Sequence, residues 1–236
     1  MHEKNHKNKT FAWDIIGIAI GSMLFFLWHS MHLYGLRWDY DEGAYLASAQ
    51  LLWHGYELYG EVYATHPPIF FYTLALAFLS PANVLWFGRF IIVLHATIGL
   101  IATSLIARRI GAKWHGLTCL IILALQPQIF RNARLINGNV PSLSIAMLAL
   151  WASLEFYHTG KNRWLVMAGI SMAWAIGIKF LVLYLTPLPI LLIALRAIHH
   201  EKEFFACAKT IIKNSFAWGI IVVMTFFIII LPFDKT

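Results

Sequence analysis

The sequence alternates long apolar runs with short polar segments, and this pattern constrains the fold more than any other feature. Apolar runs of about 20 residues form helices long enough to cross the roughly 30 Å hydrocarbon core of a bilayer. The 236-residue chain is 60% hydrophobic and 12% charged, whereas a soluble domain carries roughly 25% charged residues. The sequence therefore predicts an all-α polytopic membrane protein, because a soluble fold of this size cannot bury so much apolar surface.

About seven segments are apolar enough to be predicted as transmembrane helices. The long run 164–195 is divided in two at Lys179, because a lysine costs much free energy at mid-membrane but little at a turn near the surface. The predicted spans are Ile15–Tyr34, Leu85–Ala107, Trp114–Phe130, Val140–Tyr157, Trp164–Ile178, Phe180–Leu195 and Phe216–Leu231. We treat residues 1–236 as a single module.

The first outer loop, residues 35–84, is predicted to contain two interfacial helices. The apolar positions of Glu42–Trp53 have helical spacing, so this helix can lie flat on the membrane. The run Ile69–Leu79 is apolar but too short to cross a bilayer. We therefore predict that it also lies in the interface.

The basic residues predict the orientation of the chain. Under this layout, twelve of the eighteen lysines and arginines lie on the side of the N-terminus and six on the other. Because cytoplasmic loops are enriched in these residues, we expect residues 1–12 to be a cytoplasmic tail of a multi-pass plasma (inner) membrane protein. A retained signal anchor fits the basic N-terminus followed by a long apolar run. Nucleic acid is not an expected partner despite the net charge of +7, because the basic residues form no continuous face.

Five acidic residues gather in the first outer loop, and three of them, Asp39, Asp41 and Glu42, lie where a helix is predicted to begin. One interpretation is that they cap this helix and stay solvated. Another is that Asp39 and Asp41 bind a divalent cation such as Mg²⁺ or Mn²⁺. A glycosidase-like carboxylate pair is disfavoured, because neighbouring residues on one helical turn point apart.

Four cationic or titratable residues are predicted to reach the same outer face. They are His66, Arg131, Arg134 and Lys179. A histidine beside two prolines is more often structural, and a single arginine near the interface can simply extend its charge to water. Several such residues on the face that also carries the acidic cluster indicate a site for a phosphate-bearing lipid.

In their order and membrane placement, several short motifs resemble the integral-membrane GT-C glycosyltransferases that use polyprenyl-phosphate sugars. The closest group contains the protein mannosyltransferases, the aminoarabinose transferases and the RgtA-like enzymes. The motifs are Asp41-Glu42-Gly43-Ala44-Tyr45, His66-Pro67-Pro68, Phe87-Gly88-Arg89, Ala107-Arg108-Arg109, Arg131-Asn132-Ala133-Arg134 and Gly177-Ile178-Lys179-Phe180. The resemblance extends from about Trp13 to Leu195 and implies a seven-span module with two interfacial helices in the first outer loop.

The resemblance implies an inverting transfer of a hexosyl or pentosyl group at the outer membrane face. The donor would be a lipid-linked sugar, and the acceptor a lipid, a glycan or a protein, with membrane lipids around the module. Asp41 would be the general base, and Glu42 or Asp39 would orient it or help to hold a metal. Contacts to the donor phosphate are expected from His66, Lys179, Arg134 and, with less support, Arg131.

The sequence departs from this group in two ways. Many relatives have lysine where His66 stands, and relatives usually continue with further spans or an outer domain beyond the length of this chain. We therefore expect the C-terminal part of the family to be missing here. A membrane transporter and a non-catalytic GT-C-like scaffold remain as alternatives; transporters carry ionisable groups near the bilayer midplane, whereas this cluster lies outside the membrane.

Overall fold

The computed structural model describes residues 2–35, 39–111 and 114–230, with the backbone alone for residues 2–12. The helices are α1 (His2–Met31), α2 (Tyr40–Trp53), α3 (Pro68–Ala75), α4 (Val84–Ile110), α5 (His115–Leu125), α6 (Pro127–Asn132), α7 (Asn139–Thr159), α8 (Asn162–Ile178), α9 (Pro187–His200) and α10 (Phe204–Ile230). Three short 3₁₀ helices are η1 (Leu76–Leu79), η2 (Pro81–Asn83) and η3 (Phe180–Leu185). The described residues contain no strand beyond one isolated bridge between Leu58 and Val62, which confirms the all-α prediction.

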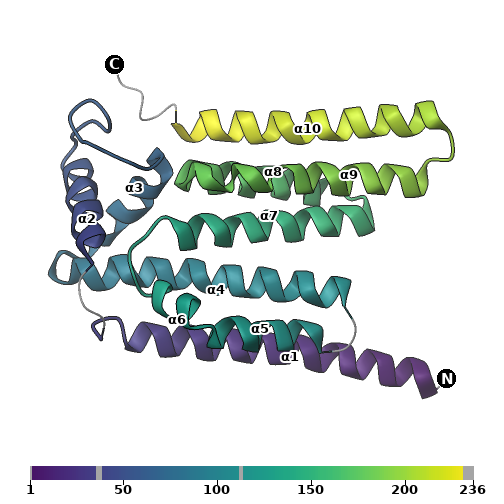
Figure 1. Ribbon diagram of the computed structural model, residues 1–236, viewed down its shortest axis with the longest axis horizontal. Helices are drawn as coiled ribbons and strands as arrows, with labels where there is room; N and C mark the ends of the chain where they lie inside the picture. The colour runs from purple at the N-terminus through teal and green to yellow at the C-terminus, as the bar shows by residue number, and fades with distance from the viewer. Residues whose placement is uncertain (1, 36–38, 112–113, 231–236) are drawn as a thin grey trace.

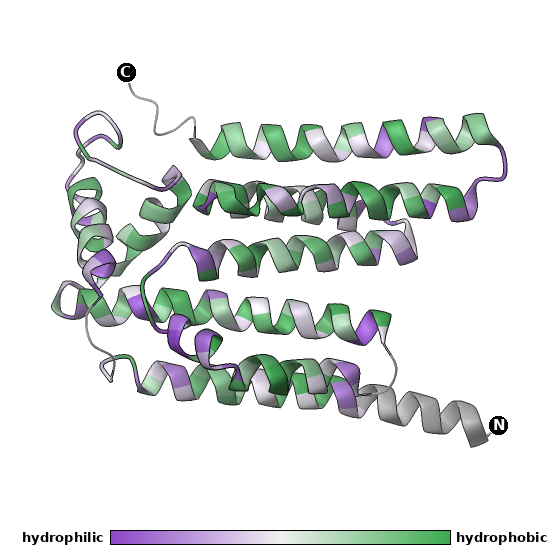
Figure 2. Ribbon diagram, in the orientation of Figure 1, coloured by the Kyte–Doolittle hydropathy of each residue, from purple (hydrophilic) through white to green (hydrophobic). Residues whose placement is uncertain are grey.

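The long helices run side by side, and the two short helices α2 and α3 lie together at one end of them (Figure 1). This end also holds the start of α7 and the junction between α8 and η3 (Figure 1). Hydrophobic residues extend along the helices, while hydrophilic residues gather near their ends and on α6 (Figure 2). The arrangement is that of a multi-pass integral membrane protein.

By length and composition, five segments of the described chain can cross a membrane. They are Trp13–Met31, Pro81–Ile110, Asn139–Thr159, Phe180–His200 and Phe204–Ile229. The helix α8 is 17 residues long and lies among them. The predicted continuous span Trp114–Phe130 is wrong, because the 11-residue α5 ends before Pro127 and α6 begins there. Proline has no N–H to donate to the preceding turn, so the helix is interrupted.

Of two other predicted boundaries, one agrees with the structure and one differs from it. The chain turns at Lys179, where α8 ends in extended backbone (φ −157°, ψ 126°), which confirms the predicted division of the run 164–195. The last helix begins at Phe204 rather than at Phe216. Cys207 therefore lies on a helix, and both Cys119 and Cys207 are free cysteines.

The main core lies between α7 and α8 and continues beneath α3. Alanines without exposed surface line the contact between α7 and α8, among them Ala149, Ala152, Ala168 and Ala175. Small side chains let two membrane helices approach closely, so that dispersion contacts replace the hydrophobic effect that lipid does not supply. In contrast, α10 is largely exposed, because only 6% of its apolar 18-residue stretch is buried within the protein. Residues of α2 and α3 belong to the same core, which packs them against the end of the bundle.

Candidate functional site

The helix α2 begins with a capping box that orients its first turn. The side chain of Asp39 accepts a hydrogen bond from the backbone N–H of Asp41 (3.3 Å), and Glu42 accepts one from the backbone N–H of Asp39 (3.2 Å). Both acids thus satisfy backbone donors that a helix start leaves unpaired. Asp41 is exposed, so its carboxylate remains accessible at the start of the helix.

Glu42 forms a buried ion pair with Arg89 of α4. The side chains are 0% and 1% exposed, and the guanidinium donates to both carboxylate oxygens, from Nε to Oε1 (2.9 Å) and from Nη2 to Oε2 (2.6 Å). Glu42 also accepts from the backbone N–H of Ile136 (2.9 Å), and Arg89 donates to the carbonyl of Leu33. Four segments therefore meet at this pair, which fixes the position of Asp41 next to it.

His66 is buried beside α2 and α3. Its ring lies edge-on to the ring of Tyr45, with centroids 5.0 Å apart, and 4.9 Å from the ring of Phe70. Its Nδ1 lies 3.0 Å from the hydroxyl of Thr65. The Nε2 atom is buried and has no hydrogen-bond partner among the described residues.

Lys179 lies next to His66 through the close approach of Gly138. The ammonium of Lys179 donates to Oδ1 of Asn139 (2.7 Å). A Cβ atom added at Gly138 would lie 2.6 Å from Cδ2 of His66 and 3.7 Å from Cδ of Lys179. A side chain at position 138 would therefore displace His66, so glycine is required for the two residues to lie close together.

The charges of Lys179 and Asp41 both affect the pKa of His66. Burial lowers the pKa of the imidazole below its ordinary value, and the positive charge of Lys179 lowers it further, whereas the carboxylate of Asp41 opposes the shift. His66 is therefore neutral at pH 7 and interacts with one cation and one anion of the predicted site.

We predict that His66 makes the protein less stable as the pH falls from 7 to 5. A lowered pKa in the folded state means that the unfolded chain binds the proton more tightly. The contribution of the neutral His66 ring to stability is thus fully present above the unfolded-state pKa of about 6.5. It is lost as the pH falls toward the lower pKa of the folded state. In detergent solution, the melting temperature of His66→Asn should fall less over this range than that of the unaltered protein. Equal falls would contradict the assignment.

A groove of about 460 Å³ opens beside His66. Thr65, His66, Pro67 and Pro68 line one part of it, and Phe180 and Phe226 line another. The groove therefore offers polar groups next to aromatic surface. This combination suits a molecule with a polar head and an apolar chain.

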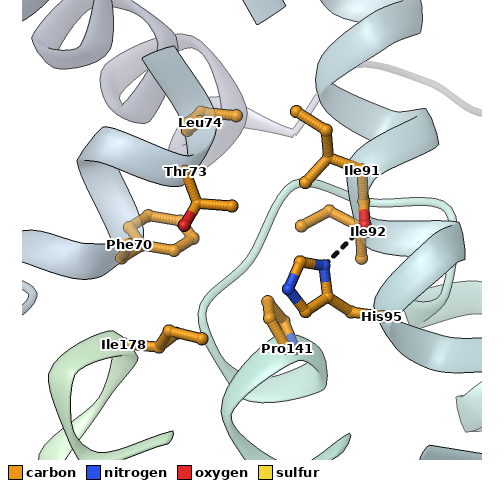
Figure 3. Close-up of a pocket in the computed structure, with 8 residues that line it drawn as sticks. All are labelled: Phe70, Thr73, Leu74, Ile91, Ile92, His95, Pro141 and Ile178. Carbon is orange, nitrogen blue, oxygen red and sulfur yellow. Dashed lines mark hydrogen bonds between the residues drawn. The ribbon is translucent and has the colours of Figure 1, made fainter. Parts of the chain in front are cut away.

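A second cavity, in the core, is far too small for a sugar. It measures about 10 Å³, scarcely the room of one water molecule, and apolar side chains of four helices surround His95 there (Figure 3). The ring of His95 is held by a bond between Nδ1 and the carbonyl of Ile91 (2.8 Å). We treat this cavity as a packing defect.

The two predicted arginines lie apart from the contacts of His66 and Lys179. Arg134 is buried against the end of α1, where it donates to the carbonyl of His32 (3.4 Å), and its guanidinium lies over the ring of Phe130. Arg131 is exposed on α6. The sequence grouped all four residues at one phosphate, whereas the contacts of the described residues bring only His66 and Lys179 together.

Asp39 and Asp41 are the candidate metal ligands. The described residues contain no group of three or more His, Cys, Asp or Glu side chains placed to hold a metal. Mg²⁺ is often held by one or two carboxylates together with substrate phosphates and water. A cation at this pair would therefore depend on oxygen atoms of the donor.

Sequence reasoning missed the partners of the predicted residues. Arg89 was noted as part of a motif, although an arginine inside an apolar run is itself a sign of a buried acidic partner. Asn139 and Phe226 gave no local signal, because they reach the site only through the packing of α7 and α10.

The comparison with protein families decides the class of this protein. The family of dolichyl-phosphate-mannose-protein mannosyltransferases matches residues 65–233. The chain belongs to this family. It is therefore a membrane glycosyltransferase of the GT-C type, and the family implies a lipid-linked sugar donor with a glycan or protein acceptor. The matched residues of this mannosyltransferase-family chain include His66, Arg134 and Lys179, whereas Asp41 lies before the first matched residue. No curated protein and no solved structure matches the chain.

Proposed function

We propose that this protein transfers a hexosyl or pentosyl group from a polyprenyl-phosphate donor to a hydroxyl of a lipid, glycan or protein acceptor, with inversion at the anomeric carbon. The observation that supports this most is the cluster of Asp41, His66 and Lys179 beside the groove that contains Phe180 and Phe226. The aromatic part of the groove would take the first isoprene units. The part beside His66, which lies next to Lys179, would take the phosphate.

In this proposal Asp41 acts as the general base. Its carboxylate takes the proton of the acceptor hydroxyl while the hydroxyl oxygen attacks the anomeric carbon from the face opposite the phosphate. The bond from the anomeric carbon to the phosphate oxygen breaks, and the lipid phosphate leaves with the electron pair. Asp39 and Glu42 act through the helix start that they hold.

Lys179 and His66 would stabilise the leaving phosphate. The ammonium of Lys179 is kept in place by Asn139 and carries a full charge. His66 is neutral at pH 7, and a phosphate beside its buried Nε2 would favour the protonated ring. A divalent cation at Asp39 and Asp41 would add to this stabilisation when bound.

The reaction would take place at the outer face of the plasma (inner) membrane, with the N-terminus in the cytoplasm. The charge asymmetry of the loops supports this orientation, and the end of the bundle that carries α2 and α3 is opposite the N-terminus (Figure 1). A transporter is a weaker candidate, because the clustered ionisable groups lie at one end of the helices rather than midway along them.

We expect Lys179→Gln to raise the KM for a lipid-phosphate sugar by about tenfold or more and to lower kcat as well, because the charge faces both the bound and the leaving phosphate. The assay measures transfer from a radiolabelled polyprenyl-phosphate sugar by the full-length protein in vesicles. Arg163→Gln, which removes an exposed charge elsewhere, is the matched control. Equal kinetics for the two variants would exclude Lys179 from the donor site.

A further inference from the structure

The connection between α6 and α7 contacts the candidate site at several positions. It reaches the end of the bundle that carries α2 and α3 (Figure 1). The backbone N–H of Ile136 donates to Oε1 of Glu42 (2.9 Å) at the start of α2. The absence of a side chain at Gly138 leaves room for the ring of His66, which a Cβ atom would approach to 2.6 Å. The connecting segment, residues 136–139, thus lies against both the start of α2 and the ring of His66.

The last residue of the connecting segment holds the cation of the site. Oδ1 of Asn139 accepts a hydrogen bond from the ammonium of Lys179 (2.7 Å). One short stretch of backbone therefore contacts the start of α2, the loop before α3 and the end of α8. The course of this backbone sets how far Asp41 lies from His66 and Lys179. Such distances matter for group transfer, because a displacement of about 1 Å can lower a rate by about 10²-fold.

The side chain of Asn137 fixes the middle of the connecting segment through hydrogen bonds to the backbone on both sides. Its Nδ2 donates to the carbonyls of Asn132 (3.0 Å) and Leu135 (2.7 Å), and its Oδ1 accepts from the N–H of Val140 (3.0 Å). An amide side chain carries donors and an acceptor on one rigid plane, and both kinds are used here. Asn137 thus ties the end of α6 to the first turn of α7 and closes the loop between them.

The position of this asparagine follows from the glycine next to it. Gly138 is the N-cap residue of α7 and has no side chain that could accept from the helix start. A capping side chain at this position would displace His66. The first turn of α7 is instead satisfied from one residue earlier, by Asn137. The close approach to His66 therefore makes the connecting segment depend on Asn137.

Ile136 anchors the connecting segment in a different way. Its side chain is 1% exposed and packs against α4, where a Cβ atom added at Gly88 would lie 2.7 Å from its Cδ1. Apolar packing is not directional, so it keeps the segment in the core without fixing how its peptide groups point. The hydrogen bonds of Asn137 supply that direction, because they weaken steeply when their angles change.

We infer that Asn137 is a positioning residue, which holds the start of α2, His66 and Lys179 at the separations that sugar transfer requires. The inference rests on the proposed function, because it assigns these groups to one reaction. The hydrogen bonds of Asn137 to other described residues all go to backbone groups, so it acts through the backbone rather than on the substrate. Its loss should therefore lower the rate constant of transfer more than it weakens the binding of the donor.

The kinetic test compares Asn137→Ala with Asn137→Ser in full-length protein in vesicles, with the rate of transfer divided by the amount of folded protein. Serine can still accept from the N–H of Val140 and cap α7, but it cannot bond both carbonyls of the loop. We expect kcat to fall by about tenfold or more in both variants, and the KM for the lipid-phosphate sugar to change less. Asn162→Ala, at an exposed position at the start of α8, should leave both constants unchanged. Full transfer by Asn137→Ser would show that Asn137 only caps a helix, and the inference would fail.

A chemical test detects the position of His66 without turnover. Diethyl pyrocarbonate modifies accessible neutral imidazoles, and peptide mass spectrometry gives the modification rate of each histidine in detergent. His66 is 8% exposed and His95, within α4, is 9% exposed, so the two are matched. We expect Asn137→Ala to raise the rate at His66 by about threefold or more, because its cover opens locally, and to leave the rate at His95 unchanged. Equal rises at both histidines would indicate a general loss of stability and, like the lack of a rise at His66, would overturn the inference.

The two tests separate this inference from the proposed function. If the unaltered protein transfers no lipid-phosphate sugar, the proposed function fails, while a selective rise at His66 still supports the hold of Asn137 on the connecting segment. If the unaltered protein transfers sugar and Asn137→Ala keeps the full kcat, the inference fails and the proposed function stands.

Discussion

Asp41→Asn is expected to lower sugar transfer by about 10²-fold or more and to leave membrane insertion and donor binding intact. Asparagine keeps the shape of the side chain but cannot take a proton from the acceptor hydroxyl. The helix start should survive, because its cap is formed by Asp39 and Glu42 rather than by Asp41. Transfer in vesicles and donor retention by the purified protein measure the two properties separately.

The control for Asp41→Asn is Glu61→Gln, which removes a negative charge from an exposed position between α2 and α3. If Asp41 is the base, Glu61→Gln transfers sugar at close to the unaltered rate. If Asp41 only stabilises the end of α2, both variants retain transfer, because asparagine serves almost equally well near a helix start. That result would remove Asp41 from the mechanism and leave Asp39 as the next candidate.

Arg89→Met is expected to destabilise the protein by about 3–5 kcal/mol, because it leaves Glu42 buried without its charge partner. Transfer should fall with it, since the start of α2 is no longer held against α4. The matched control is Arg109→Met, whose pair with Glu155 (2.7 Å) has an arginine that is 38% exposed. Such an exposed pair contributes only about 0–1 kcal/mol. Denaturant unfolding in detergent measures both changes.

A double variant separates charge compensation from helix placement. Glu42→Leu with Arg89→Met replaces the ion pair by apolar side chains and should recover much of the stability lost in Arg89→Met. It also removes the acceptor for Ile136 and one half of the capping box, so transfer should stay low. Recovery of full transfer would show that the ion pair does not position Asp41.

The helical architecture could be predicted from the apolar runs, because a membrane helix must satisfy its backbone within a single segment. Lys179 marked a turn for the same reason, since its charge avoids the membrane interior. The interruption at Pro127 was missed because the run 114–130 was considered as a whole. A single proline changes the average hydropathy of such a run little. The early start of α10 was missed because its first turns are less apolar than its end.

The candidate site was predictable only in part. The position of His66 next to Lys179 depends on the close approach at Gly138, a tertiary contact that no local pattern reveals. Glu42 was grouped with exposed acids because it neighbours Asp41, although the structure buries it against Arg89. Charges that share a membrane face need not share a site, as the separate contacts of Arg134 illustrate.

The central claim is tested most directly by transfer in sealed vesicles with the full-length protein in one orientation. A polyprenyl-phosphate sugar is supplied with a hydroxyl-bearing acceptor on the face that carries Glu57, and the product is analysed for its anomeric configuration. The account predicts release of lipid phosphate on that face and a product with the anomeric configuration opposite to that of the donor. Retained configuration, or transfer only when the acceptor is supplied on the face of the N-terminus, would contradict it.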